Sequence, residues 1–328
     1  MGGTEAALKR RRPMSATRSA PRILCIGIPV RDLTFRVESV PERGSKANAS
    51  HFEEICGGNA LNAAIAIARL GGRASLVGPM GDTQEMSSRF ILERMAQEGI
   101  DIGHIVRMPG LTTPVSAIMI EPAGERTLVI YRDPDLWTVK LPDANELLDD
   151  CQAVLVENRC AEFCAELCAE ARRRGIPVIV GVDRAMPLQG GLLTVASHLL
   201  FASEQLQETA GLADDGAALK RLAGLTPAFL AGTRGPRGTL WLNREGAIEE
   251  TPAFPVDAVD TLGAGDVFQG AFALAVAEGE SPPEALRFAS AAAALKCTSF
   301  GGALAAPQRI EVEALLRRGN GGHTTPTP

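Results

Sequence analysis

The sequence Asp260-Thr261-Leu262-Gly263-Ala264-Gly265-Asp266 continues directly into the apolar segment VFQGAFALAVAEG (267–279), which is expected to form a helix. Small residues ahead of a helix leave backbone N–H groups exposed at its positive end, where the missing side chains let phosphate approach closely. This stretch therefore predicts an anion site that opens a helix.

Asp266 stands at the start of the same helix, where a carboxylate would repel phosphate. It makes chemical sense if it faces an incoming hydroxyl and accepts its proton. With a reference pKa of about 3.9, it is expected to be ionised at neutral pH without special tuning. A carboxylate in the first turn also stabilises a helix by about 0.3–1 kcal/mol, so the motif alone leaves a structural role equally open.

Strands and helices alternate through most of the remaining chain. Apolar or β-branched runs predict strands at 22–28, 74–80, 153–157, 177–182, 197–202 and 227–232, and helices are expected at 59–70, 87–98, 161–174, 263–278 and 283–297. Such alternation predicts an α/β fold, with a doubly wound, mostly parallel sheet covered on both faces. Strands around 32–55 and 114–132 do not fit the alternation of strands and helices. They are expected to form a small separate β-sheet, a lid over the site.

Composition and the chain ends narrow the function classes. A formal net charge of −6 argues against a nucleic-acid partner, and no apolar run approaches the roughly 20 residues of a membrane span. Seven cysteines without CxxC spacing favour a reduced, cytoplasmic protein. Residues 1–21 and 317–328 are predicted to be disordered tails around one domain at 22–316. The Arg-rich start lacks a secretory core and leaves an organelle-targeting signal open.

The motif DTLGAGD, together with Gly57-Gly58-Asn59-Ala60-Leu61-Asn62-Ala63-Ala64 and the alanine-rich helix after it, resembles the two signatures of the PfkB (ribokinase-like) carbohydrate kinases. The resemblance covers roughly 22–316 in the expected order, and no P-loop motif is present. It implies ATP-dependent phosphorylation of a sugar hydroxyl, with Asp266 as the base and the amides of Gly263, Ala264 and Gly265 as the anion hole.

The resemblance also assigns binding residues. Asp32, Gly57, Gly58 and Asn62 match sugar contacts, and Thr233, Gly235 and Gly238 match the nucleotide loop. Without the family, Asp32 would be a solvated loop charge and GTRGPRG (232–238) a glycine-rich hairpin turn.

Two cations are implied as cofactors. Mg²⁺ is expected with ATP, because it neutralises the β- and γ-phosphate oxygens. Asp260 and Gly301 match segments tied to a monovalent cation, which makes K⁺ a further candidate. Ser203 and Leu206 stand where many members carry an Asn-x-x-Glu motif that organises Mg²⁺, which puts metal placement by that motif in doubt.

The stretches SAIMIEPAGERTLVIY, VDTLGAGDVFQGA and RFASAAAALKCTSFGG resemble the sulfofructose kinase subfamily most. Lys46 and Arg159 match its cationic sulfonate contacts, although both could be ordinary surface charges. Ile130 departs from its expected Asn, which leaves ketohexoses, sugar acids and phosphorylated sugars open as substrates. A nucleoside kinase and a non-catalytic sugar sensor are the alternatives. The resemblance also suggests a homodimer through the lid, whose uncovered edge would favour pairing.

Overall fold

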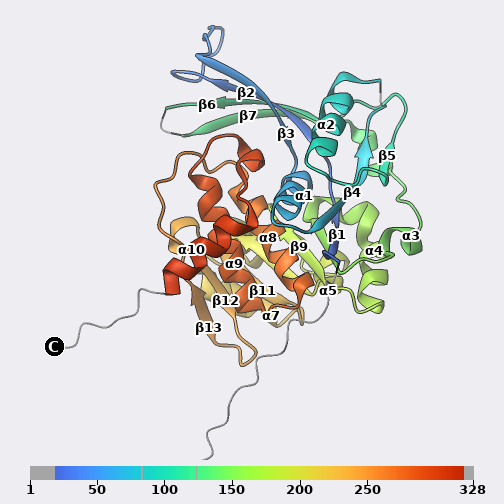
Figure 1. The fold of residues 1–328 in the computed structure, drawn as a ribbon, viewed down its shortest axis with the longest axis vertical. Helices are drawn as coiled ribbons and strands as arrows, with labels where there is room; N and C mark the ends of the chain where they lie inside the picture. The colour runs from blue at the N-terminus through green and yellow to red at the C-terminus, as the bar shows by residue number, and fades with distance from the viewer. Residues whose placement is uncertain (1–18, 83, 123, 321–328) are drawn as a thin grey trace, which may run out of the picture.

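The computed structural model describes residues 19–82, 84–122 and 124–320, which form a large sheet wrapped in helices and a smaller sheet projecting from it (Figure 1). The nine strands of the large sheet follow the order β13-β12-β11-β10-β9-β8-β1-β4-β5. They are β1 (Arg22–Ile26), β4 (Arg73–Met80), β5 (Ile105–Arg107), β8 (Ala153–Glu157), β9 (Val178–Val182), β10 (His198–Ala202), β11 (Phe229–Thr233), β12 (Thr239–Leu242) and β13 (Ile248–Thr251). Only the pairings of β12 are antiparallel, as expected for a doubly wound sheet with an added edge hairpin.

Helices cover both faces of this sheet. They are α1 (Asn59–Arg69), α2 (Met86–Gln97), α3 (Ala144–Leu148), α4 (Ala161–Arg173), α5 (Gly191–Val195), α6 (Ser203–Ala210), α7 (Asp215–Ala223), α8 (Ala264–Glu278), α9 (Pro282–Cys297) and α10 (Arg309–Asn320). Short 3-10 turns lie at η1 (Pro134–Thr138), η2 (Asn158–Cys160), η3 (Gly235–Arg237) and η4 (Gly302–Ala305). None of the helices within the described residues is long and apolar enough to cross a bilayer.

Two hydrophobic cores sandwich the sheet, because successive side chains of each strand point to opposite faces. In β1, Ile23 and Cys25 belong to the core built with α1, α2, α8, α9 and α10. Leu24 and Ile26 belong to the core built with α3 to α7. This double burial explains why the central strands read as continuous apolar runs, and it confirms the predicted fold class.

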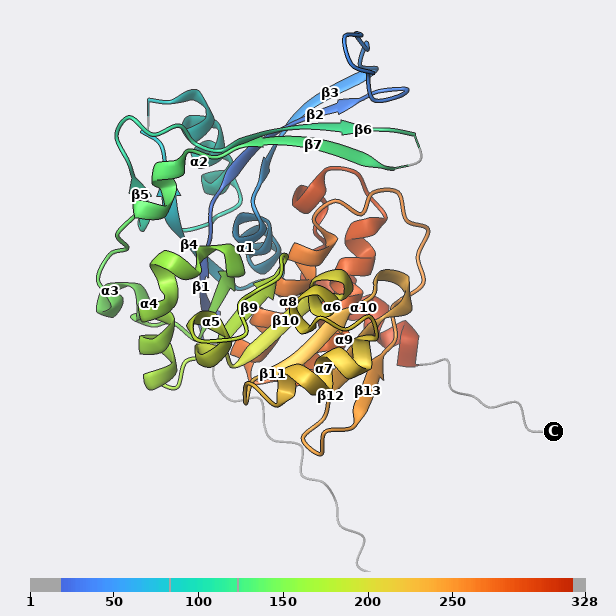
Figure 2. The same cartoon turned by 180° about the vertical axis from the view of Figure 1, so that it is seen from behind.

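The second sheet is the predicted lid. It consists of β2 (Val30–Arg36), β3 (His51–Gly57), β6 (Val115–Ile120) and β7 (Arg126–Tyr131), in the order β3-β2-β6-β7. Figure 2 shows it extending from the body over the orange and red C-terminal third of the chain. The β2–β3 hairpin begins and ends two residues beyond the predicted 32–55, so both Asp32 and Gly57 lie on paired strands.

The boundaries of the domain differ slightly from the prediction. Helix α10 continues to Asn320, four residues into the segment predicted to be a C-terminal tail, and β1 begins at Arg22 as expected. Most of the two predicted tails, 1–18 and 321–328, lies outside the described residues. Sequence reasoning also missed α6 and α7, which follow β10 and cover one face of the sheet.

Candidate active site

The start of α8 is the segment where an anion hole is predicted. Gly263 is the N-cap of the helix and has φ 76°, a left-handed conformation that favours glycine. A Cβ on Gly265 would meet no described atom within 4 Å, so the absent side chain leaves open space in front of the first amides. The Ala264 amide donates to the Thr261 carbonyl at 3.2 Å, and the N–H groups at the positive end of this 15-residue helix are suited to a phosphoryl group.

Asp266 lies in the first turn of α8, and a residue of the neighbouring helix α1 fixes its carboxylate by a hydrogen bond. The Nδ2 of Asn62 donates to its Oδ2 at 2.8 Å, and the two helices pack so closely that a Cβ on Gly270 would lie 2.5 Å from the Ala63 carbonyl oxygen. Burial of the carboxyl raises its pKa to about 7, despite the opposing bond from Asn62. The expectation that Asp266 is ionised without tuning was therefore wrong, because burial beside α1 moves its pKa close to the working pH of a general base.

Asp32 lies on the inner face of the lid sheet, where Ser116 Oγ donates a hydrogen bond to its Oδ1. Burial raises the pKa of this carboxyl to about 6. Gly57 makes room for it, since a Cβ there would lie 1.8 Å from Asp32 Oδ2. Gly58 follows with φ 97°, and a Cβ there would lie 2.3 Å from the Ile28 carbonyl oxygen. Gly57 is therefore required by the Asp32 side chain and Gly58 by the backbone at the start of α1.

Glu157 is a further acidic residue of the site that sequence reasoning missed. It ends β8, is only 4% exposed, and accepts a hydrogen bond from the Ala60 amide at 2.7 Å. Burial raises its pKa to about 7, although Arg159 opposes the shift. Because its charge raises the pKa of Asp266, Glu157 and the catalytic candidate lie in one electrostatic cluster.

Arg159 follows Glu157 and is engaged by carboxylates. Its guanidinium forms an ion pair with Asp183 and lies 3.4 Å from Glu157 Oε2 through Nε. Asn59 Nδ2 donates to the same Asp183 at 3.1 Å. The predicted anion contact therefore lies beside the site, but much of its charge is already neutralised by protein carboxylates.

Arg132, just after β7, is a further cation beside Glu157 and Asp183. Its Nε is buried and has no hydrogen-bond partner among the described residues, whereas Arg159, Glu157 and Asp183 all act on its charge. Burial, reinforced by the charge of Arg159, lowers its pKa. A buried guanidinium with a free N–H is a candidate ligand contact that no motif indicated.

The positions of Glu157 and Asp183 could have been predicted from the order of the strands in the sequence. Both come at or just after the carboxyl end of a central parallel strand, β8 and β9 respectively. Ligands of doubly wound sheets bind beyond these strand ends. The polar residues that end the runs AVLVE and PVIVGVD were therefore the available signal.

Lys46 is the predicted site residue that the structure does not bring to the others. It is exposed in the loop beyond the Arg36–His51 pair that ends the β2–β3 hairpin, while Asp32 and Gly57 lie towards the other end. Four residue pairs of hairpin separate Asp32 from that end, roughly 13 Å at the usual rise of a strand.

The predicted nucleotide loop joins β11 to β12 by way of η3. Thr233 Oγ1 donates to the Phe201 carbonyl at 3.2 Å, which ties the end of β11 to β10. Gly235 has φ 58° with open space around its Cα, and Gly238 has φ 80° with the Thr251 carbonyl oxygen 2.3 Å from where a Cβ would lie. The loop is thus a tight glycine turn at the carboxyl edge of the sheet.

The predicted cation segments meet behind the anion hole. Asp260 Oδ2 accepts from the Gly302 amide at 3.3 Å, next to Gly301, whose φ is 114°. The same carboxylate is paired with Lys296 at 3.0 Å, a contact that sequence reasoning missed because 36 residues separate the two.

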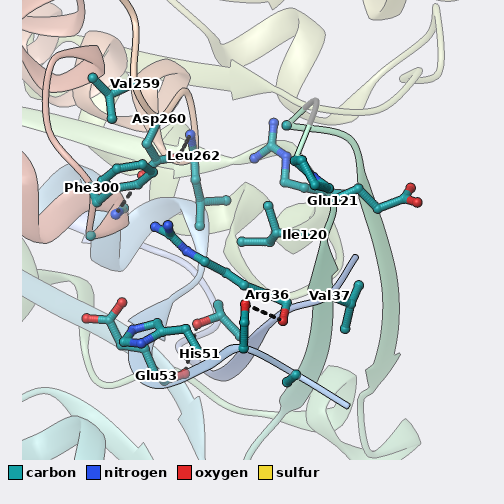
Figure 3. A pocket seen from close by; sticks show the side chains of 18 of the residues that line it. Arg36, Val37, His51, Glu53, Ile120, Glu121, Val259, Asp260, Leu262 and Phe300 are labelled. Atoms are coloured by element: carbon teal, nitrogen blue, oxygen red, sulfur yellow. Dashed lines mark hydrogen bonds between the residues drawn. The ribbon is translucent and has the colours of Figure 1, made fainter. Parts of the chain in front are cut away.

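A cavity of about 800 Å³ opens between the lid and the loops ahead of α8 (Figure 3). Arg36, Ile120 and Glu53 line it from the inner face of the lid, opposite Leu262 and Phe300 of the body. The guanidinium of Arg36 lies 4.1 Å from the centroid of the Phe300 ring, a contact that joins lid and body. The cavity therefore lies between the lid and the segments 258–262 and 300–302, and neither Asp32 nor Asp266 is among the residues that line it.

Comparison with known proteins agrees with this geometry. A sequence model described as pfkB family carbohydrate kinase matches residues 20–309. The chain belongs to this family. It is 30% identical over 299 residues to a ribokinase of Bacillus subtilis, covering 90% of this chain and 99% of the relative. A ketohexokinase of Mus musculus is 27% identical over 289 residues, covering 84% and 96%. A solved structure from Agrobacterium tumefaciens, provisionally described as a ribokinase, has a TM-score of 0.86 at 36% identity and covers 92% and 99%.

This pfkB family member is accordingly an ATP-dependent sugar kinase of the ribokinase-like group. Of the relatives named above, the two described as ribokinases match at higher identity than the ketohexokinase, and the resemblance to sulfofructose kinases stays a prediction.

Magnesium fits this pfkB kinase as a companion of the nucleotide phosphates. Among the described residues no group of three or more His, Cys, Asp or Glu side chains could hold a metal ion by itself. Leu206, at the position of the family's metal-organising Glu, is fully buried in the core, and Ser203 Oγ donates to Asp215 at 2.8 Å. Since Mg²⁺ keeps several waters and is commonly bound through substrate phosphates, a dedicated carboxylate cage is not required.

Proposed function

We propose that this kinase transfers the γ-phosphate of Mg-ATP to a hydroxyl of a small sugar, with Asp266 as the general base. One observation carries the proposal. A carboxyl with a pKa of about 7 is fixed by Asn62 in the first turn of α8, directly after the open turn from Gly263 to Gly265.

The geometry supports an in-line transfer. Asp266 accepts the proton of the sugar hydroxyl, and the resulting oxygen forms a bond to the γ-phosphorus as the bond to the β-phosphate oxygen breaks. The amides of Gly263, Ala264 and Gly265 at the helix N-terminus stabilise negative charge that grows on the transferring group. ADP and the sugar phosphate leave, and Asp266 returns its proton to solvent.

Sugar recognition is assigned to groups that accept hydrogen bonds. Asp32 faces inward from the lid, Glu157 ends β8, and the Oδ1 of Asn62 is buried without a partner among the described residues. Unpaired buried acceptors are costly unless a ligand donates to them. A sugar hydroxyl would satisfy the Oδ1 of Asn62, and others would add donors to Asp32 and Glu157, which already accept from Ser116 and the Ala60 amide. Gly57 and Gly58 would allow close approach.

The nucleotide is assigned to the loop of Thr233, Gly235 and Gly238, where two positive φ angles and an open Gly235 leave room for a ligand against the backbone. Bound Mg²⁺ would supply charge neutralisation on the phosphates.

Ribose is the first substrate to test, because the relatives at 30% and 36% identity are described as ribokinases. An anionic ketose, including a sulfonated or phosphorylated fructose, is the second. The unpaired Nε of Arg132 favours an anionic substrate. The ion pair of Arg159 with Asp183 and the distance of Lys46 from Asp32 argue against it. Ile130 adds an apolar wall in the row of Ser116 and Asp32, which a neutral sugar ring tolerates.

The deciding experiment is an ADP-release assay with Mg-ATP and a panel of ribose, fructose, 6-phosphofructose, 6-sulfofructose, a ketogluconate and adenosine. Wild type is compared with Asp266→Asn and with Arg132→Gln. We expect turnover on a neutral sugar that Asp266→Asn abolishes and Arg132→Gln leaves within about threefold. A preference for an anionic sugar that Arg132→Gln removes selectively would establish the second substrate class, and preference for adenosine would make this a nucleoside kinase.

We also propose that two copies pair through the outer face of the lid. Phe52, Val129 and Tyr131 are 49%, 68% and 52% exposed, and alternation along the strands places them opposite the inward-facing positions. Exposed apolar side chains on an uncovered sheet favour self-association. Sedimentation analysis should show a dimer that Val129→Glu converts to a monomer, and a monomeric wild type would refute the pairing.

The seven cysteines are free thiols, which supports the expected reducing, cytoplasmic setting.

A further inference from the structure

Lys296 is a charged residue whose burial neither the motif nor the catalytic scheme explains. It lies in the last turn of α9, and its side chain is 0% exposed. Its Nζ donates to the backbone oxygen of Asp260 at 2.7 Å and to Oδ2 of the same residue at 3.0 Å. Burying an ammonium is costly unless it is paired and hydrogen-bonded, so this contact must hold a defined arrangement.

Asp260 joins three segments around that ammonium. Its Oδ1 accepts from the Leu262 amide at 2.9 Å, and its Oδ2 accepts from the Gly302 amide at 3.3 Å. The Asp260 amide itself donates to the Cys297 carbonyl at 3.1 Å. The end of α9, the loop before α8 and the turn at 301–302 therefore meet at a single carboxylate.

This junction borders the anion hole. Gly263 follows Leu262 directly, and a Cβ on Gly263 would lie 3.2 Å from the Ala303 amide nitrogen, so the turn at 301–303 packs against the first residue of the hole. Any group that fixes Asp260 against this turn also fixes the direction of the amides that face the phosphoryl group.

The residues do not fit the monovalent cation expected at Asp260 and Gly301. Both the side-chain Oδ2 and the backbone oxygen of Asp260 are already engaged by the Lys296 ammonium. A second cation at these oxygens would lie within a few ångströms of a like charge, in surroundings where repulsion is poorly screened. Here the fold supplies the positive charge from within the chain.

We infer that Lys296 is a positioning residue whose ammonium replaces a bound monovalent cation and makes the anion hole independent of K⁺. The expected effect of Lys296 on turnover rests on the proposed phosphoryl transfer, whereas its expected effect on thermal unfolding does not. The ammonium contributes one positive charge and hydrogen bonds to the same carboxylate and carbonyl oxygens that would otherwise hold an ion.

The kinetic test compares wild type, Lys296→Ala and Lys296→Met in chloride salts of K⁺, NH₄⁺, Na⁺ and tetramethylammonium at constant ionic strength. Wild-type turnover should stay within about twofold across the four salts. Lys296→Ala should lose at least tenfold in kcat with a smaller change in sugar KM, and NH₄⁺ or K⁺ should restore at least half of the loss. Lys296→Met fills the space without charge, so it should lose activity and show no recovery. Lys140→Ala, an exposed lysine, controls for general salt effects.

Thermal unfolding in the same salts provides a second readout that needs no substrate. NH₄⁺ or K⁺ at 100 mM should raise the Tm of Lys296→Ala by about 2–4 °C relative to tetramethylammonium, because an ion binds only the folded site. Wild type and Lys296→Met should show no such difference. Strong activation of wild type by K⁺, or a Lys296→Ala variant that no cation rescues in either assay, would overturn the inference. Cation-specific stabilisation without sugar turnover would instead sustain the role of Lys296 and reject the proposed substrates.

Discussion

Replacing Asp266 by asparagine is expected to stabilise the folded protein above pH 7 while removing catalysis. Burial raises the pKa of this carboxyl from 3.8 to about 7, so the folded chain holds the proton more tightly than the unfolded chain. A group of this kind contributes its full stability below the unfolded pKa, near pH 4, and loses it as pH rises through the folded pKa, near pH 7. Asparagine is neutral throughout and escapes that loss.

The size of the gain follows from the shift. A change of about three pKa units corresponds to an upper value of about 4 kcal/mol at 1.36 kcal/mol per unit. Because Asp266 is only partly buried in the open cleft, solvent screening reduces this figure. We expect Asp266→Asn to raise the unfolding free energy by about 2–3 kcal/mol at pH 8 and by less than half of that at pH 5.

Urea unfolding of wild type and variant at the two pH values measures this directly, and unchanged m-values would show that the same surface is exposed. Turnover should fall by about 10²–10⁴ or more, the usual range for loss of a positioned base. Asp257→Asn, on an exposed residue of the loop before α8, should change neither quantity. A variant no more stable than wild type at pH 8 would refute the buried ionisation, and undiminished turnover would refute the role as base.

Three further predictions follow from single contacts. Gly57→Ala should raise the sugar KM at least about tenfold with little change in the KM for ATP, because its Cβ would lie 1.8 Å from Asp32 Oδ2; a sugar KM within twofold of wild type would contradict this. Leu206→Glu, which restores the family residue, should lower the Tm by several degrees through burial of a charge, and a reduced Mg²⁺ requirement at unchanged Tm would show the reasoning to be wrong. The logarithm of kcat/KM should rise with pH to a plateau above about 7 as Asp266 ionises, so a rate independent of pH between 5.5 and 8 would argue against it.

The sequence is most informative where chemistry and local structure coincide. The turn from Gly263 to Gly265 requires one positive φ and open space, and both follow from the residue types alone. The strands beside β1 alternate between two cores, which makes them unbroken apolar runs that are easily recognised. The anion hole and the sheet could therefore be predicted before any tertiary contact was known.

The remainder of the site depends on contacts between distant segments. Lys296 lies in the alanine-rich run AAAALKC, and nothing near it in sequence indicates that it meets Asp260. Glu157 reads as the polar end of a strand, and its raised pKa arises from burial in the folded protein, to which the charge of Asp183 adds. The pKa of Asp266 was misjudged for the same reason, since a reference value contains no information about burial.

The arrangement of acceptors and donors explains how one cleft can hold two chemically opposite ligands. Asp32 on the lid, together with Glu157 and the Oδ1 of Asn62 on the body, offers hydrogen-bond acceptors, which suit a ligand that brings donors, as a polyol does. At the helix N-terminus the amides that follow Gly263 offer only donors, which suits phosphate oxygens. Asp266 lies at the border between the two regions, bonded to Asn62 on one side and placed in the first helical turn on the other. In the proposed mechanism, a proton leaving the sugar and a phosphoryl group arriving at it therefore meet at Asp266, whose pKa of about 7 allows it to accept that proton near neutral pH.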